Sequence, residues 1–576
     1  MKRTVRILSL LMILAVVMLS TASCGFLKLM DSLPEQTEAG DSTTGDATES
    51  TTDPGTESTT DDSSSPDDPS AGDEIKSILE RYPYTLTQED VDDFYEMLDV
   101  CEALLLPDGT ETEQIDHSIT TMTDAYYHIS TQANLAYLIF SMDSDNEEAS
   151  DAYLFASGAS SDCYAAYMKL CKKVDGSQSA YRDTFFSDWS EADISLMRTY
   201  TDEMAELQKQ QDALLVEYRE LSDAQFRDGS ARIFAQTVAI NNAMAELMGY
   251  DNYMEYAYEL SYQREYTPED AEQIRAYTKE YLIPLCSKLL TRFQGTYGKF
   301  NQAQANTVYS FLYDDYDAVS TDLLDGYLES LPQNLRDAMK GMFEDKNVIF
   351  NDNAGGLEGA FTGYLYDYNH PVCYFGPGYQ NTFTLVHELG HYAAFEISEG
   401  LNTPMDLAEV HSQGNEFLML AYTQDVNTGA TYRALGLYQC YQTIASTIAC
   451  VIVDEFEQAV YTTGAGAEDF DGIMAAICAE YGGDDFLNNY VTDMDSYWRY
   501  VVVESPGYYI SYATSGLAAL ELYAVASEDY EEGVRQYHIL VDEARYSSSL
   551  TDALVAADLH TPFQEELYLA LQEVFQ

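Results

Sequence analysis

The feature that most constrains this chain is the pentad His-Glu-Leu-Gly-His at residues 387–391, inside a stretch with the apolar pattern of a buried helix. Residues four apart lie on one face of a helix, so His387 and His391 can offer imidazole nitrogens to one metal ion. Glu388 lies beside them, where a carboxylate can take a proton from water. We expect one of the two threonines just before the pentad to cap this helix. The pattern predicts a zinc hydrolase site, although two packed histidines in a chance pentad would give the same letters.

A zinc site of this kind needs a third protein ligand. The turn signals at residues 400–404 end the first helix, and a second helix is expected to open near Asp406. Glu409 and Glu416 are seven residues apart on this second helix and share a face, so we predict Glu409 as the ligand and Glu416 as the partner that orients a ligating histidine. His411 lies on another side of the helix and is expected to bond elsewhere. Two earlier carboxylates would continue the first helix and point away from the ion: Glu396 and Glu399.

The motif Glu-x-x-Ser-Gln-x-x-Glu at residues 409–416, after His-Glu-x-Gly-His, resembles the thimet oligopeptidase and oligopeptidase F family of zinc metallopeptidases. The resemblance covers roughly residues 200–570 and is densest over 359–418. The pentad is shared with many zinc peptidases, so the glutamate motif and the tyrosine-rich stretch narrow the choice. Three further stretches resemble the family: 246–256, 359–375 and 508–516.

The resemblance implies a mainly α fold, with a zincin-type (gluzincin) catalytic core and a small β-sheet, enclosed by helices around a substrate channel. It implies one Zn²⁺ per chain as the cofactor. It also implies that tyrosines matching Tyr508, Tyr509 and Tyr512 face the substrate carbonyl, and Tyr512 is the favoured oxyanion donor. Members of the family usually carry a histidine about ten residues upstream of this stretch, and residues 498–505 contain none. That departure concerns substrate binding and catalysis rather than the metal.

The N-terminus predicts export. Residues 1–23 combine a basic start with a short apolar run, which is typical of a secretory leader. Cys24 follows Thr-Ala-Ser and resembles the lipidated cysteine of a bacterial lipobox, although Thr21 departs from the usual aliphatic residue. Ordinary cleavage with release is the alternative. Residues 24–74 are rich in Ser, Thr, Asp and Glu and predict a disordered acidic tether.

Two folded parts are expected after the tether: an N-terminal helical domain over 75–226 and a catalytic domain over 227–576. The formal net charge of -70 argues against nucleic acid as a partner. Eight scattered cysteines besides Cys24 show no Cys-x-x-Cys spacing, so they are either small buried hydrophobes or disulfide partners. Single helices are predicted over 238–260, 268–293, 305–317 and 321–342.

The amino-acid composition changes between residues 348 and 379, where short apolar runs alternate with Gly, Asn, Tyr and Pro. This pattern predicts a small sheet before the zinc helix, with an exposed edge strand that could pair with an extended peptide. His370 is interpreted as a loop residue within it.

The expected activity is an extracytoplasmic zinc endopeptidase that hydrolyses short peptides through a zinc-activated water, with Glu388 as the general base. The lipidated Cys24 would anchor it to the bilayer. We expect a monomer, although nothing in the sequence specifies the oligomeric state. Two alternatives stay open: a lipoprotein that binds peptides without cutting them, and a gluzincin that acts on cell-wall peptides. The intact Glu388 disfavours the first, and the lack of a recognisable wall-binding module weakly disfavours the second.

Overall fold

The structure is a computed structural model. It describes residues 78–105, 112–144, 146–177, 181–186, 194, 197–198, 201–219, 221–316, 321–357, 359–400, 403–427, 429–482, 494–546 and 548–575. The predicted leader 1–23, the lipidation site Cys24 and the tether 24–74 lie outside these residues.

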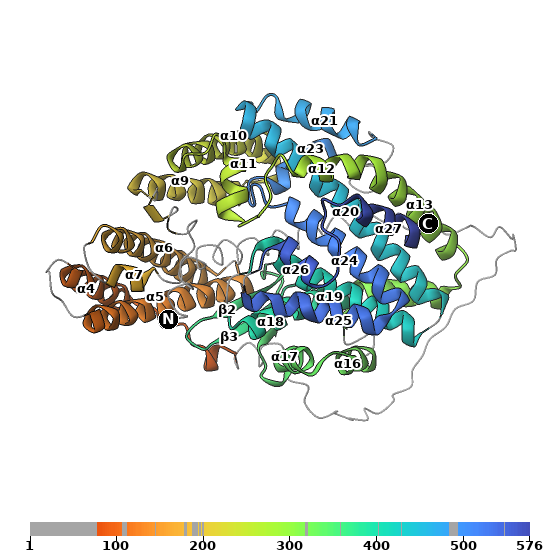
Figure 1. The fold of residues 1–576 in the computed structure, drawn as a ribbon, viewed down its shortest axis with the longest axis horizontal. Coiled ribbons are helices and arrows are strands. Elements are labelled where there is room, and N and C mark those ends of the chain that lie inside the picture. Colours follow the sequence, from red (N-terminus) through yellow and green to blue (C-terminus); the bar gives the residue numbers. More distant parts are fainter. Residues whose placement is uncertain are drawn as a thin grey trace, which may run out of the picture.

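Helices, all of them long except the short α7, form the N-terminal part, at the left of Figure 1. They are α4 (Gln88–Leu105), α5 (Thr112–Met142), α6 (Glu147–Asp175), α7 (Tyr181–Phe185), α9 (Asp202–Arg219) and α10 (Asp223–Met248). Helices α4 to α6 share a core that includes Phe94, Tyr126 and Tyr164. This core also contains Met244 and Met248 of α10, a helix that runs across the predicted boundary at 226.

The segment that follows is helical but more broken than the sequence pattern predicts. It contains α11 (Tyr253–Tyr256), the π-helix η2 (Ala257–Ser261), α12 (Ala271–Tyr277), the π-helix η3 (Thr278–Leu282), α13 (Ile283–Tyr297), α14 (Gln302–Tyr313), α16 (Thr321–Ser330) and α17 (Gln333–Glu344). Gly249, at φ +88°, ends α10, so the single helix predicted over 238–260 is wrong. The helix predicted over 321–342 is also wrong, because Pro332 breaks it and precedes α17.

The predicted small sheet is confirmed. Its strands are β1 (Val348–Phe350), β2 (Ala360–Leu365) and β3 (His370–Phe375), in the order β1-β3-β2. Strand β1 is parallel to β3, and β2 is antiparallel to it with Thr362 opposite Cys373. One face packs on α5 through residues such as Tyr137 and Phe361.

The edge strand differs from the expectation in its exposure. Strand β2 is one of the two edge strands of the sheet, but all six of its residues are buried, because α5 and α18 (Thr382–Ser398) both pack against it. His370 is the first residue of β3 rather than a loop residue, and its Nδ1 lies 3.0 Å from Glu396 Oε1.

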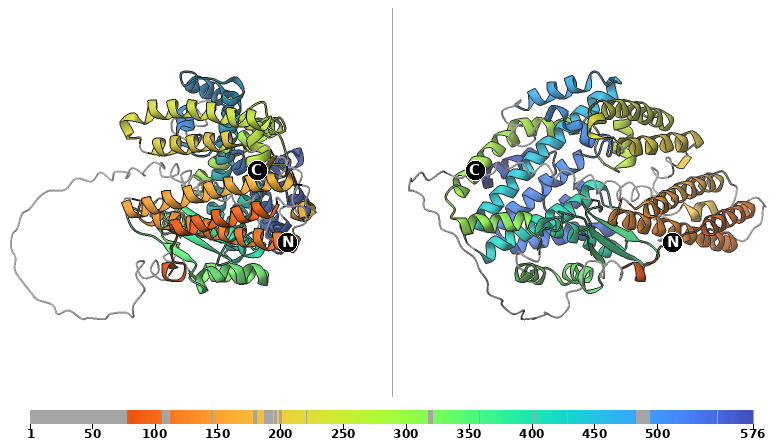
Figure 2. Two further views of the ribbon diagram at one scale, coloured as in Figure 1. Left: turned by 90° about the vertical axis from the view of Figure 1, so that its left-hand side faces the viewer. Right: turned by 180° about the vertical axis from the view of Figure 1, so that it is seen from behind.

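The C-terminal part surrounds the pentad with helices. After α18 come α19 (Met405–Val426), α20 (Ala430–Thr463), α21 (Phe470–Glu480), α23 (Met494–Val501), α24 (Ile510–Glu528), α25 (Tyr530–Glu543), the 3-10 turn η4 (Ala544–Tyr546), α26 (Leu550–Ala556) and α27 (Glu565–Phe575). Helix α24 packs along both α19 and α20, and the views of Figure 2 show these three helices together at the centre of this part. By length and composition α20 could cross a membrane, but 78% of its most apolar window is buried, which fits a central core helix.

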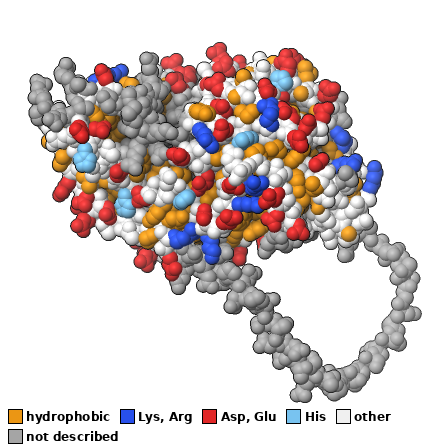
Figure 3. Space-filling model, turned by 60° about the horizontal axis from the view of Figure 1, so that its bottom comes forward, with side chains coloured by type: hydrophobic (Ala, Val, Ile, Leu, Met, Phe, Trp, Pro, Cys, Tyr) orange, Lys and Arg blue, Asp and Glu red, His pale blue; other side chains and the backbone are white. Residues whose placement is uncertain are grey.

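The outer surface is acidic, as the net charge requires. In the face shown in Figure 3, acidic side chains are spread over the surface and basic ones gather at a few places. Among the described residues the eight cysteines are all free and buried, so here they act as small hydrophobes. They are Cys101, Cys163, Cys171, Cys286, Cys373, Cys440, Cys450 and Cys478.

Candidate active site

Helix α18 carries the pentad, and an asparagine rather than a threonine caps it. The side chain of Asn381 accepts a hydrogen bond from the backbone N–H of Thr384 at 3.1 Å. The prediction that Thr382 or Thr384 caps the helix is therefore wrong, because both already lie inside it. The helix ends at Ser398, and Glu399 takes a left-handed conformation at φ +54° instead of continuing the helix.

Helices α18 and α19 cross in very close contact at Gly390. A Cβ atom placed on Gly390 would lie 2.3 Å from the carbonyl oxygen of His411 and 2.8 Å from Cα of Ser412. Only glycine permits this approach. The crossing is also fastened by Asn415 of α19, whose Nδ2 donates to the carbonyl of Val386 at 2.6 Å. The close crossing brings the carboxylates of α19 up to the histidines of α18.

The structure brings together the three predicted metal ligands. Glu409 Oε2 lies 3.8 Å from His387 Nε2 and 3.9 Å from His391 Nε2. The candidate ligand atoms of the three residues all lie within 4.8 Å of one another. Two imidazole nitrogens and one carboxylate oxygen at this spacing fit a Zn²⁺ ion, which binds such atoms at about 2.0–2.2 Å and leaves a fourth position for water or substrate.

Glu416 lies where the sequence pattern places it. Its Oε1 accepts a hydrogen bond from Nδ1 of His387 at 2.7 Å, and its Oε2 accepts one from Nε2 of Gln439 at 3.2 Å. A proton fixed on Nδ1 leaves Nε2 of the same ring as the nitrogen that faces Glu409.

Burial and neighbouring charges set the protonation of the three candidate ligands. Burial acts to lower the pKa of His387, but the hydrogen bond to Glu416 and the nearby carboxylates raise it to about 9. Burial lowers the pKa of His391 well below its ordinary value, which keeps this imidazole neutral. Burial raises the pKa of Glu409, against the opposing effects of His387 and Tyr508. A metal ion binds neutral imidazole and ionised carboxylate, so its entry releases protons from this group.

Glu388 is held by the sheet. Its Oε2 accepts a hydrogen bond from the hydroxyl of Thr362 on β2 at 2.6 Å. The thiol of Cys373 lies 3.1 Å from the same hydroxyl and donates to it, since the one proton of Thr362 goes to Glu388. Burial raises the pKa of Glu388 to about 7, against the opposing effects of His387 and Thr362. A carboxylate with a pKa near neutrality can both accept and return a proton.

The three predicted tyrosines lie at the start of α24, and their hydroxyl groups differ. Tyr508 donates to Glu409 Oε1 at 2.6 Å, so its proton supports the ligand carboxylate. The ring of Tyr512 stands edge-on to that of Tyr508, with centroids 5.0 Å apart. Tyr509 is buried, and this burial raises the pKa of its hydroxyl well above the ordinary value. The assignment of these tyrosines to the substrate carbonyl stays a prediction.

The remaining polar residues near the motif bond elsewhere. His411 Nε2 lies 3.0 Å from the carbonyl oxygen of Leu540, as expected for a histidine on another face of α19. Glu396 pairs with His370 on β3.

Several residues that shape the site were not predicted to do so. Gly390 could have been found, because an isolated glycine inside a helical pattern often marks a close packing contact. Thr362 lies in a stretch that carried the family resemblance, but its sequence gives no sign that it contacts Glu388. Arg264 and Asp406 form a buried ion pair across 142 positions of sequence, and nothing local links them.

Comparison with known proteins identifies the fold. No family model matches the sequence, and no curated protein matches it. Among solved structures, PZ peptidase A with an inhibitor matches with a TM-score of 0.67 at 16% identity, over 86% of this chain and 97% of that chain. Oligoendopeptidase F from Enterococcus faecium gives 0.53 at 14% identity, over 87% and 98%. A carboxypeptidase from Pyrococcus furiosus gives 0.51 at 12%, over 84% and 99%.

These matches define the class by fold: a mainly α, zincin-like architecture with a small sheet, as expected from the sequence. More particularly, the structural relatives include peptidases of the oligoendopeptidase F type along most of the chain. The resemblance seen in the sequence is therefore confirmed at the level of the fold.

Proposed function

We propose that this protein is a zinc-dependent endopeptidase that hydrolyses short peptides. One observation carries the proposal: Glu409 comes from a second helix to meet His387 and His391, next to a buried carboxylate, Glu388, that can act as a base. The peptidase fold of the structural relatives supports it. A protein that only bound peptides would have no use for a proton acceptor at this place.

The residues divide the chemistry between them. A zinc ion held by His387, His391 and Glu409 would supply a Lewis acid that acidifies water and polarises a carbonyl group. Glu388 takes the proton of the attacking water on Oε1, because Oε2 is occupied by the hydroxyl of Thr362. The same carboxyl group then returns the proton to the leaving amine.

Stabilisation of the oxyanion falls to a tyrosine hydroxyl in this proposal. Tyr508 is the weaker choice, because its proton is already given to Glu409. Tyr512, whose ring contacts that of Tyr508, is the favoured donor. The family's upstream histidine has no counterpart here, so the tyrosine would act without it.

The sequence supports a location for this activity. We propose that Cys24 is lipidated after removal of residues 1–23 and that the acidic segment 24–74 holds the enzyme away from the outer face of the membrane. The strongly negative chain favours peptide substrates over nucleic acid.

The test compares wild type with Glu388→Gln on a mixed peptide library, with zinc content measured in both proteins. Glu396→Gln, on the same helix, is the matched control because its carboxylate pairs with His370 and not with the ligands. We expect full zinc occupancy in all three proteins and loss of cleavage only in Glu388→Gln. Equal cleavage by Glu388→Gln and wild type would refute the role of the base. Zinc binding with no cleavage by wild type would favour the peptide-binding alternative.

A further inference from the structure

Arg264 lies at an unusual turn in the backbone. The π-helix η2 ends at Ser261, Gln263 adopts a left-handed conformation at φ +52°, and the N–H of Arg264 reaches back to the carbonyl of Tyr258 at 2.8 Å. A left-handed conformation costs a residue other than glycine roughly 1 kcal/mol, and π-turns are often found at functional sites. The fold accepts this cost and places the arginine side chain in the interior, where it is 1% exposed.

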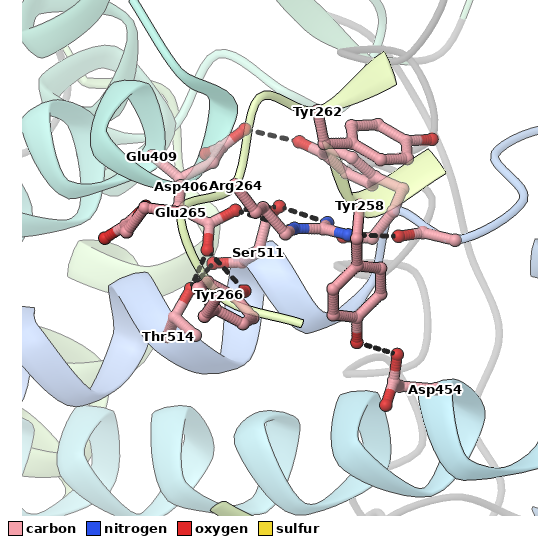
Figure 4. Close-up of polar contacts among 12 residues, drawn as sticks. Tyr258, Tyr262, Arg264, Glu265, Tyr266, Asp406, Glu409, Asp454, Ser511 and Thr514 are labelled. Carbon is pink, nitrogen blue, oxygen red and sulfur yellow. Dashed lines mark hydrogen bonds and ion pairs between the residues drawn. The ribbon is translucent and has the colours of Figure 1, made fainter. Parts of the chain in front are cut away.

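The guanidinium group is enclosed by aromatic rings. It lies 4.4 Å from the ring centroid of Tyr258 and 4.5 Å from that of Tyr262, and Figure 4 shows both rings beside it. Tyr258 in turn donates to Asp454 at 2.5 Å, and Tyr262 donates to the carbonyl of Pro506 at 2.8 Å. The plane of the guanidinium is therefore fixed before its own hydrogen bonds are counted.

One set of these hydrogen bonds goes to α19. Arg264 Nε donates to Asp406 Oδ1 at 3.2 Å, and Asp406 also accepts from Tyr266 at 2.6 Å, from Thr514 at 2.8 Å and from Ser511. The contacts are drawn in Figure 4. Asp406 precedes Glu409 by three residues, one helical turn, so the start of α19 is anchored directly beside the metal-ligand position.

The other set goes to the turn that carries Tyr508. Arg264 donates to the carbonyls of Gly507 at 3.0 Å and Tyr508 at 3.2 Å, and to the hydroxyl of Ser511 at 2.7 Å. Glu457 accepts the N–H of Gly507 at 2.8 Å from the opposite side. Tyr508 is thus held at both ends: its carbonyl accepts from Arg264 and its hydroxyl donates to Glu409.

We propose that Arg264 is a positioning residue that holds Tyr508 against Glu409, so that this carboxylate is already in its ligating position when zinc enters. The inference rests on the proposed function, because it takes Glu409 as a zinc ligand. Arginine is required, since a lysine ammonium cannot reach Asp406, the two carbonyls and Ser511 at once. The simpler account is a buried ion pair that only stabilises the fold.

The experiment measures Zn²⁺ affinity of the full-length protein by competition with a chromogenic chelator. The variants are Arg264→Lys, Tyr508→Phe and the double variant. Arg499→Lys is the matched control: Arg499 is also buried, pairs with Asp471 at 2.6 and 2.8 Å, donates to a backbone carbonyl and lies 4.3 Å from an aromatic ring centroid, but it contacts no residue of the site.

We expect Arg264→Lys and Tyr508→Phe each to weaken zinc binding by about tenfold, the lower end of what partners of metal ligands contribute. The double variant should lose less affinity than the product of the two single losses, because the contribution of Arg264 passes in part through the hydrogen bond of Tyr508 to Glu409. Arg499→Lys should bind zinc as wild type does.

A wild-type affinity in Arg264→Lys, an equal loss in Arg499→Lys, or multiplied losses in the double variant would overturn the inference. If Arg264→Lys shows no cooperative unfolding, Tyr508→Phe carries the test against Arg499→Lys, and a wild-type affinity in Tyr508→Phe would overturn the inference. Failure of the wild type to bind zinc would instead overturn the proposed function itself, and is seen before any variant is compared.

Discussion

The crossing of α18 and α19 at Gly390 permits a sharp prediction for Gly390→Ala. The added methyl group would lie 2.3 Å from the carbonyl oxygen of His411, whereas ordinary contact begins near 3.4 Å. The helices must therefore move apart by about 1.1 Å, the difference between these two distances. The obstacle is backbone, so a change of side-chain rotamer cannot relieve it.

That displacement is large on the scale of metal coordination. It equals about half of a zinc–ligand bond of 2.0–2.2 Å, so Glu409 can no longer share an ion with both histidines. We expect zinc affinity to fall at least about 100-fold, because removing a residue that only hydrogen-bonds to a metal ligand already lowers metal affinity by about 10–100-fold. Overpacking costs about 1–3 kcal/mol of unfolding free energy, and the helix preference of alanine returns only about 0.5–1 kcal/mol.

The assay is zinc titration by competition with a chelator, together with urea unfolding. Gly158→Ala is the matched control, because Gly158 also lies inside a helix and a Cβ there meets nothing within 4 Å. The control should keep wild-type zinc affinity and gain up to about 1 kcal/mol in stability. Wild-type zinc affinity in Gly390→Ala would refute the claim that the close crossing places the third ligand.

Three further predictions concern two residues at the site and one in the N-terminal helices. Glu416→Ala removes the acceptor of a ligand histidine and should weaken zinc binding 10–100-fold; unchanged affinity would refute its role. Thr362→Val should lower kcat/KM about tenfold at unchanged zinc affinity, because Glu388 loses the hydrogen bond that fixes its carboxylate. An unchanged kcat/KM would contradict this. Hydrogen bonding led by Arg198 lowers the pKa of Asp175 from 3.8 to about 2, so its ionised form stabilises the fold above 3.8, and this contribution is lost as the pH falls to about 2. Asp175→Asn should therefore cost about 1 kcal/mol in unfolding at pH 7, after allowance for solvent screening, and progressively less as the pH falls through about 2; a pH-independent cost would contradict the assignment.

The elements that build the site could be predicted because they follow local rules. The spacing of His387 and His391 predicts that both lie on one face of a helix. The turn signals at 400–404 predict that a second helix follows, and this helix carries Glu409 and Glu416. Residue type and periodicity favoured Glu409 among four nearby glutamates, and the structure brings its carboxylate close to both histidines.

What could not be predicted depends on contacts between distant segments. The burial of β2 is set by α5, more than 200 residues earlier. The hydrogen bonds from Thr362 to Glu388 and from Arg264 to Asp406 join distant segments, and no local sequence pattern indicates that these segments meet. Local patterns indicate the candidate ligands, and only the packed structure shows the residues that contact them.

Diffraction at the zinc absorption edge tests the central claim most directly. Crystals of the protein should show one anomalous peak per chain, within about 2.0–2.2 Å of Nε2 of His387, Nε2 of His391 and a carboxylate oxygen of Glu409. A peak located elsewhere, or a zinc ion bound by the two histidines with Glu409 turned away, would contradict the account.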